Sequence, residues 1–583
     1  MRLSFAFAWL CCGLLSPIAP PASAEPIDAA RLAPETAVFY AELGSLDPIL
    51  NVALDAKTRE LIEKTDAYQR YRQSGEYQHL TIGVALLEAK LGTGWQAALR
   101  DLLGGGIALC GDPASQSGFL ALRCRQPELL KKLNTALREF IEADAKTKGR
   151  PSPVKSQEHQ GVTGWSFGPG ECHILLDDLL VISNKAETLK AVIDRYGDAA
   201  AKGLTGSSRF VQARAKKPAG VLGWSWADLA ALRNDPNIQK ALTAKSDNPL
   251  AEVLLGGVGD AVRQAPYATT TLALENNRLR LRAELPFDAS QRSASRQWFF
   301  AVSANEPALN PPAMIGSFSF FRDLAGLWSA RDVLFNDAIV AQFAQADTQL
   351  GLFFSGRDFG PEVLGELAAP LQMVVARQQY PNDQPTPQLK LPALALVLKL
   401  KRPDEFAPQL LITYQKIVGF ANLAGGQNGQ PQFLLSTEEY HGATISKATY
   451  LAEAKVSRDQ APVNYNFSPA CARCGDHFVL GSTVGIVKQL TDELGKGDVS
   501  HPLTDNTALT IDAAPLTAIL SDNRELLITQ NMLSEGHTRE EAETAIGTLL
   551  DIIHRLDRFA LRLRDEPTAL SLEATLDVRP MNP

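Results

Sequence analysis

Two stretches of the chain share one pattern, DDLLVISNKAETLKAVIDRY at residues 177–196 and GDHFVLGSTVGIVKQLTDEL at residues 475–494. Each begins with a short apolar, β-prone run, which predicts a buried strand. Each continues with apolar residues at three-residue spacing, which predicts a helix with one core-facing side. The chain therefore contains one strand–helix unit twice. The identical positions are Asp178, Val181, Lys190 and Asp194, which recur as Asp476, Val479, Lys488 and Asp492.

Both helices have a polar residue at their expected start. Asn184 and Ser482 fall at the same aligned position. Asparagine and serine accept hydrogen bonds from the free backbone N–H groups of a helix N-terminus, so we predict that these residues are the N-caps.

The recurrence extends through almost the whole chain. The strand candidate ETAVFYAEL has the counterpart MIGSFSFF, and EHQGVTGWSFG is matched by EYHGATISKAT, with Gly161 aligned to Gly442. Each copy ends in a predicted hairpin, turning at Asn276-Asn277 and near Glu566-Pro567. A further strand is expected at residues 80–85. A capping box, Thr538 to Glu541, predicts a helix start in the second copy.

These patterns predict an α+β fold of two homologous repeats, each a largely antiparallel sheet with helices packed on one face. The period is too long for a solenoid. The predicted division is a signal peptide at 1–24, repeat 1 at 25–288, a linker with a short helix at 289–311, and repeat 2 at 312–583.

The N-terminus has the features of a secretory signal peptide. Arg2 precedes an apolar run at residues 3–15, and Ala22-Ser23-Ala24 is an A-x-A cleavage signal. Cleavage would leave Glu25 first. A lipoprotein would need a cysteine at the cleavage point, but Cys11 and Cys12 lie inside the apolar run. No later run is long enough to span a bilayer. We expect an exported protein without a transmembrane span after cleavage, although an uncleaved signal would act as an anchor.

Charge argues against nucleic acid as a partner. The chain has 57 Lys and Arg against 65 Asp and Glu, a net charge of −8, and no basic run stands out.

Cysteine usage does not indicate a disulfide scaffold. The residues that remain after cleavage are Cys110, Cys124, Cys172, Cys471 and Cys474. An odd number excludes complete intramolecular pairing, although export permits disulfides. Cys110 and Cys124 lie in consecutive predicted strands and can either pair or remain free buried thiols.

The signal peptide, LAPETAVFYAELGSL, LLGGGIAL, LVISNKAETLKAVIDR and IGSFSFFRDLAGLW together resemble a family of exported bacterial proteins defined as a domain of unknown function. The resemblance covers nearly the whole mature chain. It implies the fold and export, and it implies no activity, cofactor or site residue.

Two serines sit in sequences that partly match a hydrolase nucleophile elbow. Gly164-Trp165-Ser166-Phe167-Gly168 fits G-x-S-x-G, which needs a strand, a sharp turn and a helix. Pro169-Gly170 and another strand follow instead, which favours a hairpin end. Ser225 lies between a strand and a helix but lacks the second glycine.

The strongest candidate for a metal or redox site is the cluster of Cys471, Cys474 and His477. A redox CxxC opens a helix, whereas this one falls at a predicted hairpin turn. Haem attachment would need histidine where Gly475 stands. Zinc would need a fourth ligand, with His441 or Cys172 as candidates. A structural disulfide or free thiols is the favoured interpretation, with metal binding and redox chemistry as alternatives.

Trp224 and Trp226 share one face of a predicted strand, with Trp165 on a strand that can neighbour it. They can form a platform for sugar or lipid, but alternate strand positions under helices ordinarily hold core residues. We therefore predict no catalytic residue, no cofactor and no assigned metal site.

The leading hypothesis is an exported non-enzymatic scaffold or binding protein of the bacterial periplasm or cell envelope. Its expected partner is an envelope protein or a hydrophobic ligand. One alternative is a hydrolase or thiol-redox enzyme with a site between the repeats. Another is a carrier of lipid or a similar ligand.

Overall fold

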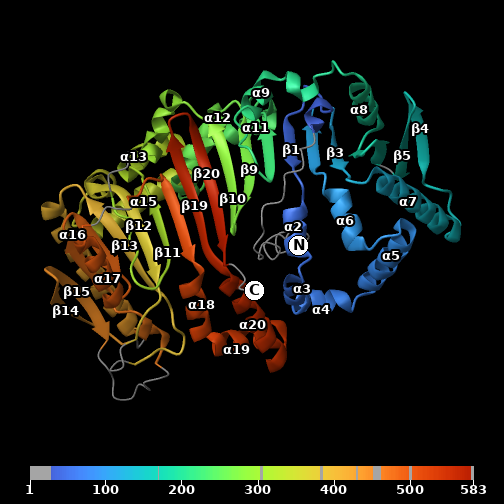
Figure 1. Cartoon of the computed structure of the whole chain (residues 1–583). Coiled ribbons are helices and arrows are strands. Elements are labelled where there is room, and N and C mark those ends of the chain that lie inside the picture. The colour runs from blue at the N-terminus through green and yellow to red at the C-terminus, as the bar shows by residue number, and fades with distance from the viewer. Residues whose placement is uncertain are drawn as a thin grey trace. The chain divides into compact units, whose positions relative to one another are not determined.

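The computed structural model describes residues 28–113, 115–168, 170–301, 306–380, 385–427, 431–450, 461–497 and 502–579 (Figure 1). The predicted signal peptide at 1–24 lies outside these residues. The described residues form two compact units. Unit 1 lies within Met1–Gln239, Ala265–Pro286 and Asp577–Pro583, and unit 2 within Lys240–Gln264 and Phe287–Leu576. The sequence boundaries at 288 and 312 differ from this division and stay a prediction.

Ten strands build the sheet of unit 1, in the order β10–β9–β8–β1–β2–β3–β7–β6–β5–β4. All pairs whose register is described are antiparallel. The strands are β1 (Phe39–Leu43), β2 (Ile107–Asp112), β3 (Ser117–Arg123), β4 (Lys155–His159), β5 (Val162–Gly168), β6 (Glu171–Leu176), β7 (Leu179–Ser183), β8 (Gly223–Ala227), β9 (Ala268–Glu275) and β10 (Arg278–Pro286).

Unit 2 has the order β20–β19–β18–β11–β12–β13–β17–β16–β15–β14, which matches the order in unit 1 strand for strand. Its described registers are antiparallel as well. The strands are β11 (Met314–Phe320), β12 (Leu367–Ala376), β13 (Ala393–Leu400), β14 (Phe433–Tyr440), β15 (Ala443–Tyr450), β16 (Ala470–Cys474), β17 (His477–Gly481), β18 (Thr507–Asp512), β19 (Leu556–Glu566) and β20 (Ala569–Val578).

Helices connect and cover the strands of each unit. In unit 1 they are η1 (Ala29–Arg31), α2 (Asp47–Ala53), α3 (Ala56–Glu63), α4 (Asp66–Arg72), α5 (Gly75–Leu91), α6 (Trp95–Leu103), α7 (Pro127–Thr147), α8 (Ala186–Gly197), η2 (Gly203–Gly206), α9 (Ser208–Arg214) and α10 (Leu229–Leu232), with α11 (Pro236–Thr243) at its boundary. In unit 2 they are α12 (Pro249–Gln264), η3 (Ala289–Gln291), η4 (Ala294–Phe300), α13 (Leu324–Ser329), α14 (Arg331–Leu334), α15 (Asp337–Phe353), η5 (Phe359–Val363), η6 (Leu364–Glu366), α16 (Pro403–Gln427), η7 (Val463–Asn466), α17 (Val484–Gly495), α18 (Ala513–Asp522), α19 (Arg524–Glu535) and α20 (Arg539–Arg555).

The prediction of an α+β fold with a large antiparallel sheet is confirmed, but the prediction that helices cover one face is wrong. On β7, Val181 packs into a core with Leu189 of α8, while its neighbour Leu180 packs with Leu129 of α7. Successive strand residues point to opposite faces, so each face has its own core and its own helix.

The same alternation occurs in unit 2. On β17, Val479 packs with Val487 of α17, while Phe478 packs with Phe406 of α16. An apolar residue at consecutive positions of a strand is typical of burial on both faces, and this is the signal that the one-face prediction overlooked.

The prediction of a strand at residues 80–85 is also wrong, because these residues lie inside α5. Ser74 caps this helix by accepting a hydrogen bond from the backbone N–H of Tyr77, and Gly92 ends it with a φ of 72°. Good caps at both ends favour a helix over a short apolar strand here.

The predicted N-caps are displaced by one residue. Lys185 precedes α8 without a side-chain cap, and Thr483 caps α17 by accepting from the N–H of Ile486. Asn184 and Ser482 instead accept hydrogen bonds from the strand backbone, at the N–H groups of Gly118 and Leu394. Both polar residues thus join the helix start to the neighbouring strand.

Candidate functional site

A tight hairpin at the end of each sheet carries the candidate site. In unit 1, β4 and β5 turn through Gln160 and Gly161, with φ values of 47° and 78°. Positive φ at both central residues is the type I′ geometry that suits the twist of a two-residue hairpin. The helix α8 follows β7 and covers one face of β5 and β6, as the contacts among these elements show.

A carboxylate on α8 fixes the hairpin turn to the helix. Asp194 Oδ1 lies 2.6 Å from His159 Nε2 and 2.8 Å from Gln160 Nε2. These two contacts attach the turn of the hairpin to the helix.

Unit 2 repeats this arrangement at the aligned positions. The turn residues His441 and Gly442 have φ values of 45° and 83°. Asp492 Oδ1 lies 2.6 Å from His441 Nδ1, and the hydroxyl of Tyr440 donates to Asp492 Oδ2 at 2.8 Å. Partial burial would raise the pKa of Asp492, but the hydrogen bonds from His441 and Tyr440 outweigh it and lower the pKa.

A pocket of about 340 Å³ lies between this hairpin and α8 in unit 1. Its apolar walls come from Val162, Ile174, Leu189 and Ile193. Gly164 also lines it, and the missing side chain at this position leaves open space between β5 and the helix. The pocket falls within the size range of small-molecule sites, and its walls are mostly apolar as such sites require.

The charged groups of this pocket are basic. Lys155 of β4 and Lys190 of α8 line it, and neither side chain has a hydrogen-bond or ion-pair partner among the residues that the structure describes. His159 also lines it but is held by Asp194. The described lining contains no Asp or Glu. The pocket thus combines apolar walls with two unneutralised ammonium groups.

A larger pocket of about 730 Å³ lies at the corresponding hairpin and helix in unit 2. Its lining includes a carboxylate, which the unit 1 lining lacks: Glu438 forms ion pairs with both Lys447 and Lys488. Hydrogen bonds from these two lysines lower the pKa of Glu438. Ile445, fully buried, occupies the strand position that Gly164 has in unit 1. The two pockets share a place in the fold and differ in chemistry.

Ser166 lacks the setting of a hydrolase nucleophile. It lies in β5, which is followed by the strand β6, and its hydroxyl donates to the carbonyl of Gly168 at 2.8 Å. Ser225 lies within β8 between two buried tryptophans. Neither serine has a hydrogen bond to a histidine among the described contacts.

Cys471 and Cys474 lie on opposite faces of β16. Cys471 packs with Tyr414 on the α16 side, and Cys474 donates to Thr491 Oγ1 of α17 at 3.4 Å. Both thiols are free. Burial raises the pKa of Cys471 to about 12 and raises that of Cys474 as well. The arrangement keeps both sulfurs protonated, which disfavours thiolate chemistry and metal ligation.

His477 belongs to an ion-pair cluster that the sequence did not reveal. Its Nε2 lies 2.8 Å from Glu306 Oε2 and its Nδ1 lies 2.9 Å from Asp476 Oδ1. Lys399 also pairs with Glu306. Burial would raise the pKa of Glu306, but hydrogen bonds from His477 and Lys399 lower it. With both ring nitrogens engaged, His477 offers no ligand to a metal.

The remaining cysteines do not come together in a disulfide or a metal site in the described part of the chain. Cys110 of β2 pairs in register with Phe119, so it does not face Cys124, and both thiols are free. Cys172 donates to the carbonyl of Ser183. Within the described residues, no group of three His, Cys, Asp or Glu side chains is arranged to hold a metal ion.

The tryptophans form no exposed platform. Trp224 and Trp226 are 3% and 1% exposed, and their rings pack against Phe210 with centroids 5.7 Å and 5.2 Å away. Trp165 lies on β5, which does not neighbour β8. The guanidinium carbon of Arg138 instead lies over the Trp165 ring, 4.1 Å from the ring centroid.

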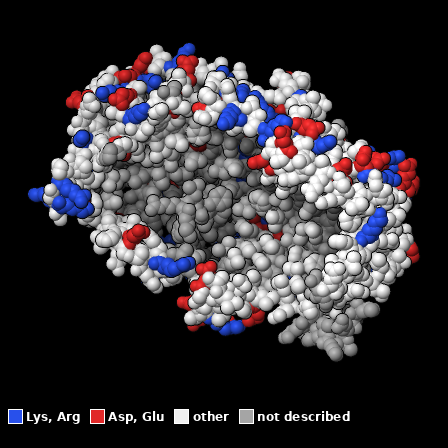
Figure 2. All heavy atoms as spheres, turned by 180° about the vertical axis from the view of Figure 1, so that it is seen from behind, with Lys and Arg blue, Asp and Glu red and all other residues white. Residues whose placement is uncertain are grey.

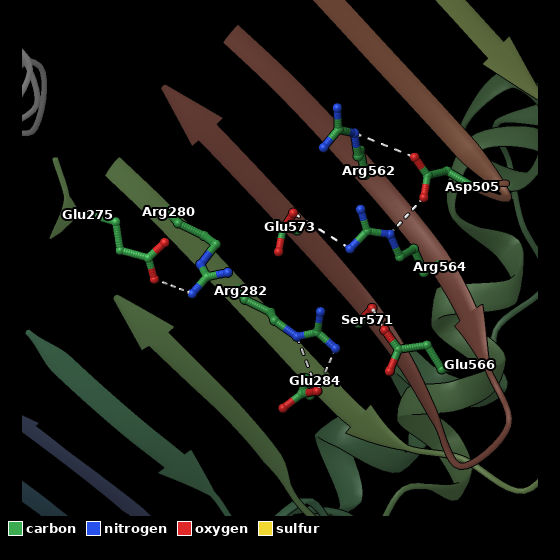
Figure 3. A network of polar contacts seen from close by, with 10 residues as sticks. All are labelled: Glu275, Arg280, Arg282, Glu284, Asp505, Arg562, Arg564, Glu566, Ser571 and Glu573. Atoms are coloured by element: carbon green, nitrogen blue, oxygen red, sulfur yellow. Dashed lines mark hydrogen bonds and ion pairs between the residues drawn. The ribbon is translucent and has the colours of Figure 1, made fainter. Parts of the chain in front are cut away.

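The arginines of the outer strands are neutralised within their own units (Figure 3). In unit 1, Arg280 Nη2 lies 2.6 Å from Glu275 Oε1. In unit 2, Arg564 and Arg562 converge on Asp505, with Nε to oxygen distances of 2.7 Å and 3.5 Å. Such partly exposed pairs stabilise little. On the face drawn in Figure 2, basic and acidic side chains are scattered in small groups, some mixed and some of one sign.

No helix in the described part of the chain has the length and apolarity to cross a bilayer. No family model and no curated protein matches the sequence. Among solved structures, crystal forms I and IV of TP0453 match at 9% identity, covering 48% and 45% of this chain and 88% and 81% of theirs. Their TM-scores of 0.24 and 0.23 are too low to support a common fold.

Proposed function

We propose that this chain is an exported, non-enzymatic binding protein of the bacterial periplasm or cell envelope, whose ligand occupies the hairpin pocket of unit 1. The observation that carries the proposal is a cavity of about 340 Å³ with apolar walls and two lysines that have no partner among the described residues. An anionic ligand with an apolar part can contact both the lysines and the apolar walls.

The proposal includes an origin by duplication, so that both units inherited a hairpin pocket. The identical strand order, the matching turns and the carboxylates Asp194 and Asp492 at one helical position support it. The two pockets would then have diverged in charge, since Glu438 pairs with two lysines in unit 2, whereas Lys155 and Lys190 have no ion-pair partner among the described residues.

Native mass spectrometry of protein released from the periplasm tests the binding function. The expected spectrum contains a complex heavier than the polypeptide, which dissociates to the bare chain under activation. A spectrum of bare chain alone, with no small molecule in an organic extract, would contradict the proposal. A pull-down from envelope extract tests whether the partner is a protein.

The competing proposal is an enzyme, and point variants distinguish it from a binding protein. Ser166→Ala and the paired Cys471→Ser and Cys474→Ser changes remove the groups that hydrolase or thiol chemistry would need. We expect these variants to retain every property of the wild type in a broad activity screen. An activity that disappears with either change would establish the enzyme instead.

Export itself is testable through the mature N-terminus. The A-x-A signal at residues 22–24 predicts that the periplasmic protein begins at Glu25. Fractionation followed by N-terminal sequencing checks this. A cytoplasmic protein that begins at Met1 would contradict export, and a membrane-bound one with the same start would indicate a retained anchor.

A further inference from the structure

We propose that the unit 1 pocket binds a single-chain amphiphile with an anionic head group, such as a fatty acid; this assignment rests on the binding function proposed above. The chain would lie along the apolar walls and the head group would meet Lys155 and Lys190. The inference follows from the placement of apolar and basic residues in one cavity.

The walls favour an aliphatic chain. Ile174, Leu189 and Ile193 are 1%, 3% and 5% exposed, so each belongs to a packed core and turns only a small part of its surface to the pocket. Val162, half-buried, continues this surface along β5. Covering the accessible part of these side chains with a ligand's methylene groups removes apolar surface from water, which favours binding of an aliphatic chain.

The basic groups favour an anion at one end. Lys155 comes from β4 and Lys190 from α8, so each of the two elements beside the pocket contributes a basic residue to its lining. The described lining has no carboxylate to neutralise them. A carboxylate between two ammonium groups forms charge-assisted hydrogen bonds, which are about twice as strong as neutral ones.

The size of the cavity favours one chain. A volume of about 340 Å³ is at the lower end of small-molecule pockets, which excludes a two-chain phospholipid from full insertion. Gly164 sets this volume on the strand side. A Cβ placed there would contact Ile174 Cγ2 at 3.4 Å and the carbonyl of Gln157 at 3.6 Å, so a larger side chain enters the pocket without a backbone clash.

The pocket of unit 2 serves as an internal comparison. Lys488 corresponds to Lys190, but it forms an ion pair with Glu438, which also pairs with Lys447 at the position of Ser166. The anionic amphiphile is therefore assigned to unit 1 alone.

Isothermal titration calorimetry of the mature chain tests the proposal with laurate, dodecanol and dodecylammonium. We expect laurate to bind most tightly and dodecylammonium least. The double change Lys155→Met and Lys190→Met should weaken laurate about tenfold, equivalent to about 1.4 kcal/mol, and leave dodecanol unchanged within twofold. Tighter binding of dodecanol or dodecylammonium, or an unchanged laurate affinity in the double variant, would overturn the assignment.

A matched pair of β5 variants locates the ligand. Gly164→Val adds a side chain on the pocket side and should weaken laurate and dodecanol together by tenfold or more. Thr163→Val adds the same residue type on the opposite face of the strand and should weaken neither. Equal effects of both variants would place the ligand elsewhere. Thermal melts of both variants verify that the fold persists.

Vesicles of phosphatidylglycerol distinguish a membrane surface from a free amphiphile. Binding to vesicles without uptake of laurate would assign the lysines to a lipid surface and overturn the pocket. If native mass spectrometry finds a retained ligand that is neutral or cationic, the binding function stands and the anionic class falls. If neither a retained ligand nor laurate binding is found, both proposals fall.

Discussion

Asp492 on α17 lies 2.6 Å from the imidazole of His441 at the turn of the β14–β15 hairpin, and Asp194 on α8 makes the same contact with His159 in unit 1. The carboxylate is a recurring sequence position, whereas the histidine is not at the same turn position in the two copies. A histidine at a different position of each hairpin thus makes the contact, and the hairpin is attached to the helix in both units.

The first prediction concerns this attachment. Asp492→Asn should loosen the hairpin while costing less than about 1 kcal/mol of global stability, because exposed ion pairs contribute little. Because folding lowers the pKa of Asp492, this carboxylate stabilises the fold at pH values above its unfolded pKa. That stabilisation is lost as the pH falls through the lower, folded pKa. Hydrogen exchange should show faster exchange in β14 and β15 only. Unchanged exchange would show that Asp492 does not hold the turn.

The second prediction concerns the Glu306 cluster. Glu306→Gln leaves Lys399 and His477 without a buried carboxylate and should destabilise unit 2 by about 3 kcal/mol, the range for breaking a buried ion pair. Urea unfolding measures it. Glu525→Gln, which alters an exposed pair with Arg539, is the matched control and should cost less than about 1 kcal/mol.

The pH dependence of the same cluster has a definite sign. The pKa of Glu306 is lowered on folding, so its stabilisation is present above the unfolded carboxyl pKa and is lost as the pH falls through the lower folded value. The pKa of Lys399 is raised despite desolvation, by its bond to Glu306. Its stabilisation is therefore lost as the pH rises through that raised value. If the Glu306→Gln variant lost as much stability at low pH as the wild type, the acid sensitivity would not originate from Glu306.

The third prediction concerns Arg322, which is 2% exposed. Its guanidinium donates to the carbonyl of Val253, to Asn506 Oδ1 and to Thr507 Oγ1, at 2.7 to 2.8 Å, and lies 3.5 Å from the ring centroid of Phe299. Burial lowers the pKa of Arg322 to about 9, so it stays charged at neutral pH.

Arg322→Met should cost about 3 kcal/mol or more, since it leaves several buried acceptors unpaired. The exposed Arg558→Met, which alters a pair with Asp512, should cost less than about 1 kcal/mol. Equal midpoints for the two variants in urea would show that the buried guanidinium does not join α12 to the sheet of unit 2.

The fourth prediction concerns the thiols. Under denaturing conditions the mature chain should titrate as five free thiols, and a reductant should leave the melting temperature unchanged. Burial raises the pKa of Cys110 and Cys471 to about 12, so neither should react in the folded state. A cross-linked peptide containing Cys471 and Cys474 would contradict their placement on opposite faces of β16.

Local sequence patterns predicted the elements whose signals are contained in a few residues. The strand–helix pair at residues 177–196 is β7 and α8, the turn at Asn276 joins β9 to β10, and Thr538 with Glu541 forms the expected capping box. In each case the cap, the periodicity or the turn residue is local, so it acts whatever the rest of the chain does.

The site depends on features that no local pattern contains. Glu306 and His477 are 171 positions apart, and only the fold brings them together. The pocket depends on a side chain that is absent at Gly164, and on a lysine in each of two elements. The consecutive apolar residues Leu180 and Val181 are a local signal of burial on both faces of the sheet, whereas the α+β fold class alone predicts one covered face.

The alkylation rate of Cys172 tests most directly whether the unit 1 pocket is the binding site. Cys172 lines this pocket, while Cys474 is a similarly half-buried thiol outside both pockets. Peptide-level mass spectrometry compares protein as released from the periplasm with the same protein after a lipophilic resin has removed its ligand. The account predicts that Cys172 reacts faster after removal while Cys474 does not change. An unchanged rate at Cys172, with a ligand demonstrably removed, would contradict it.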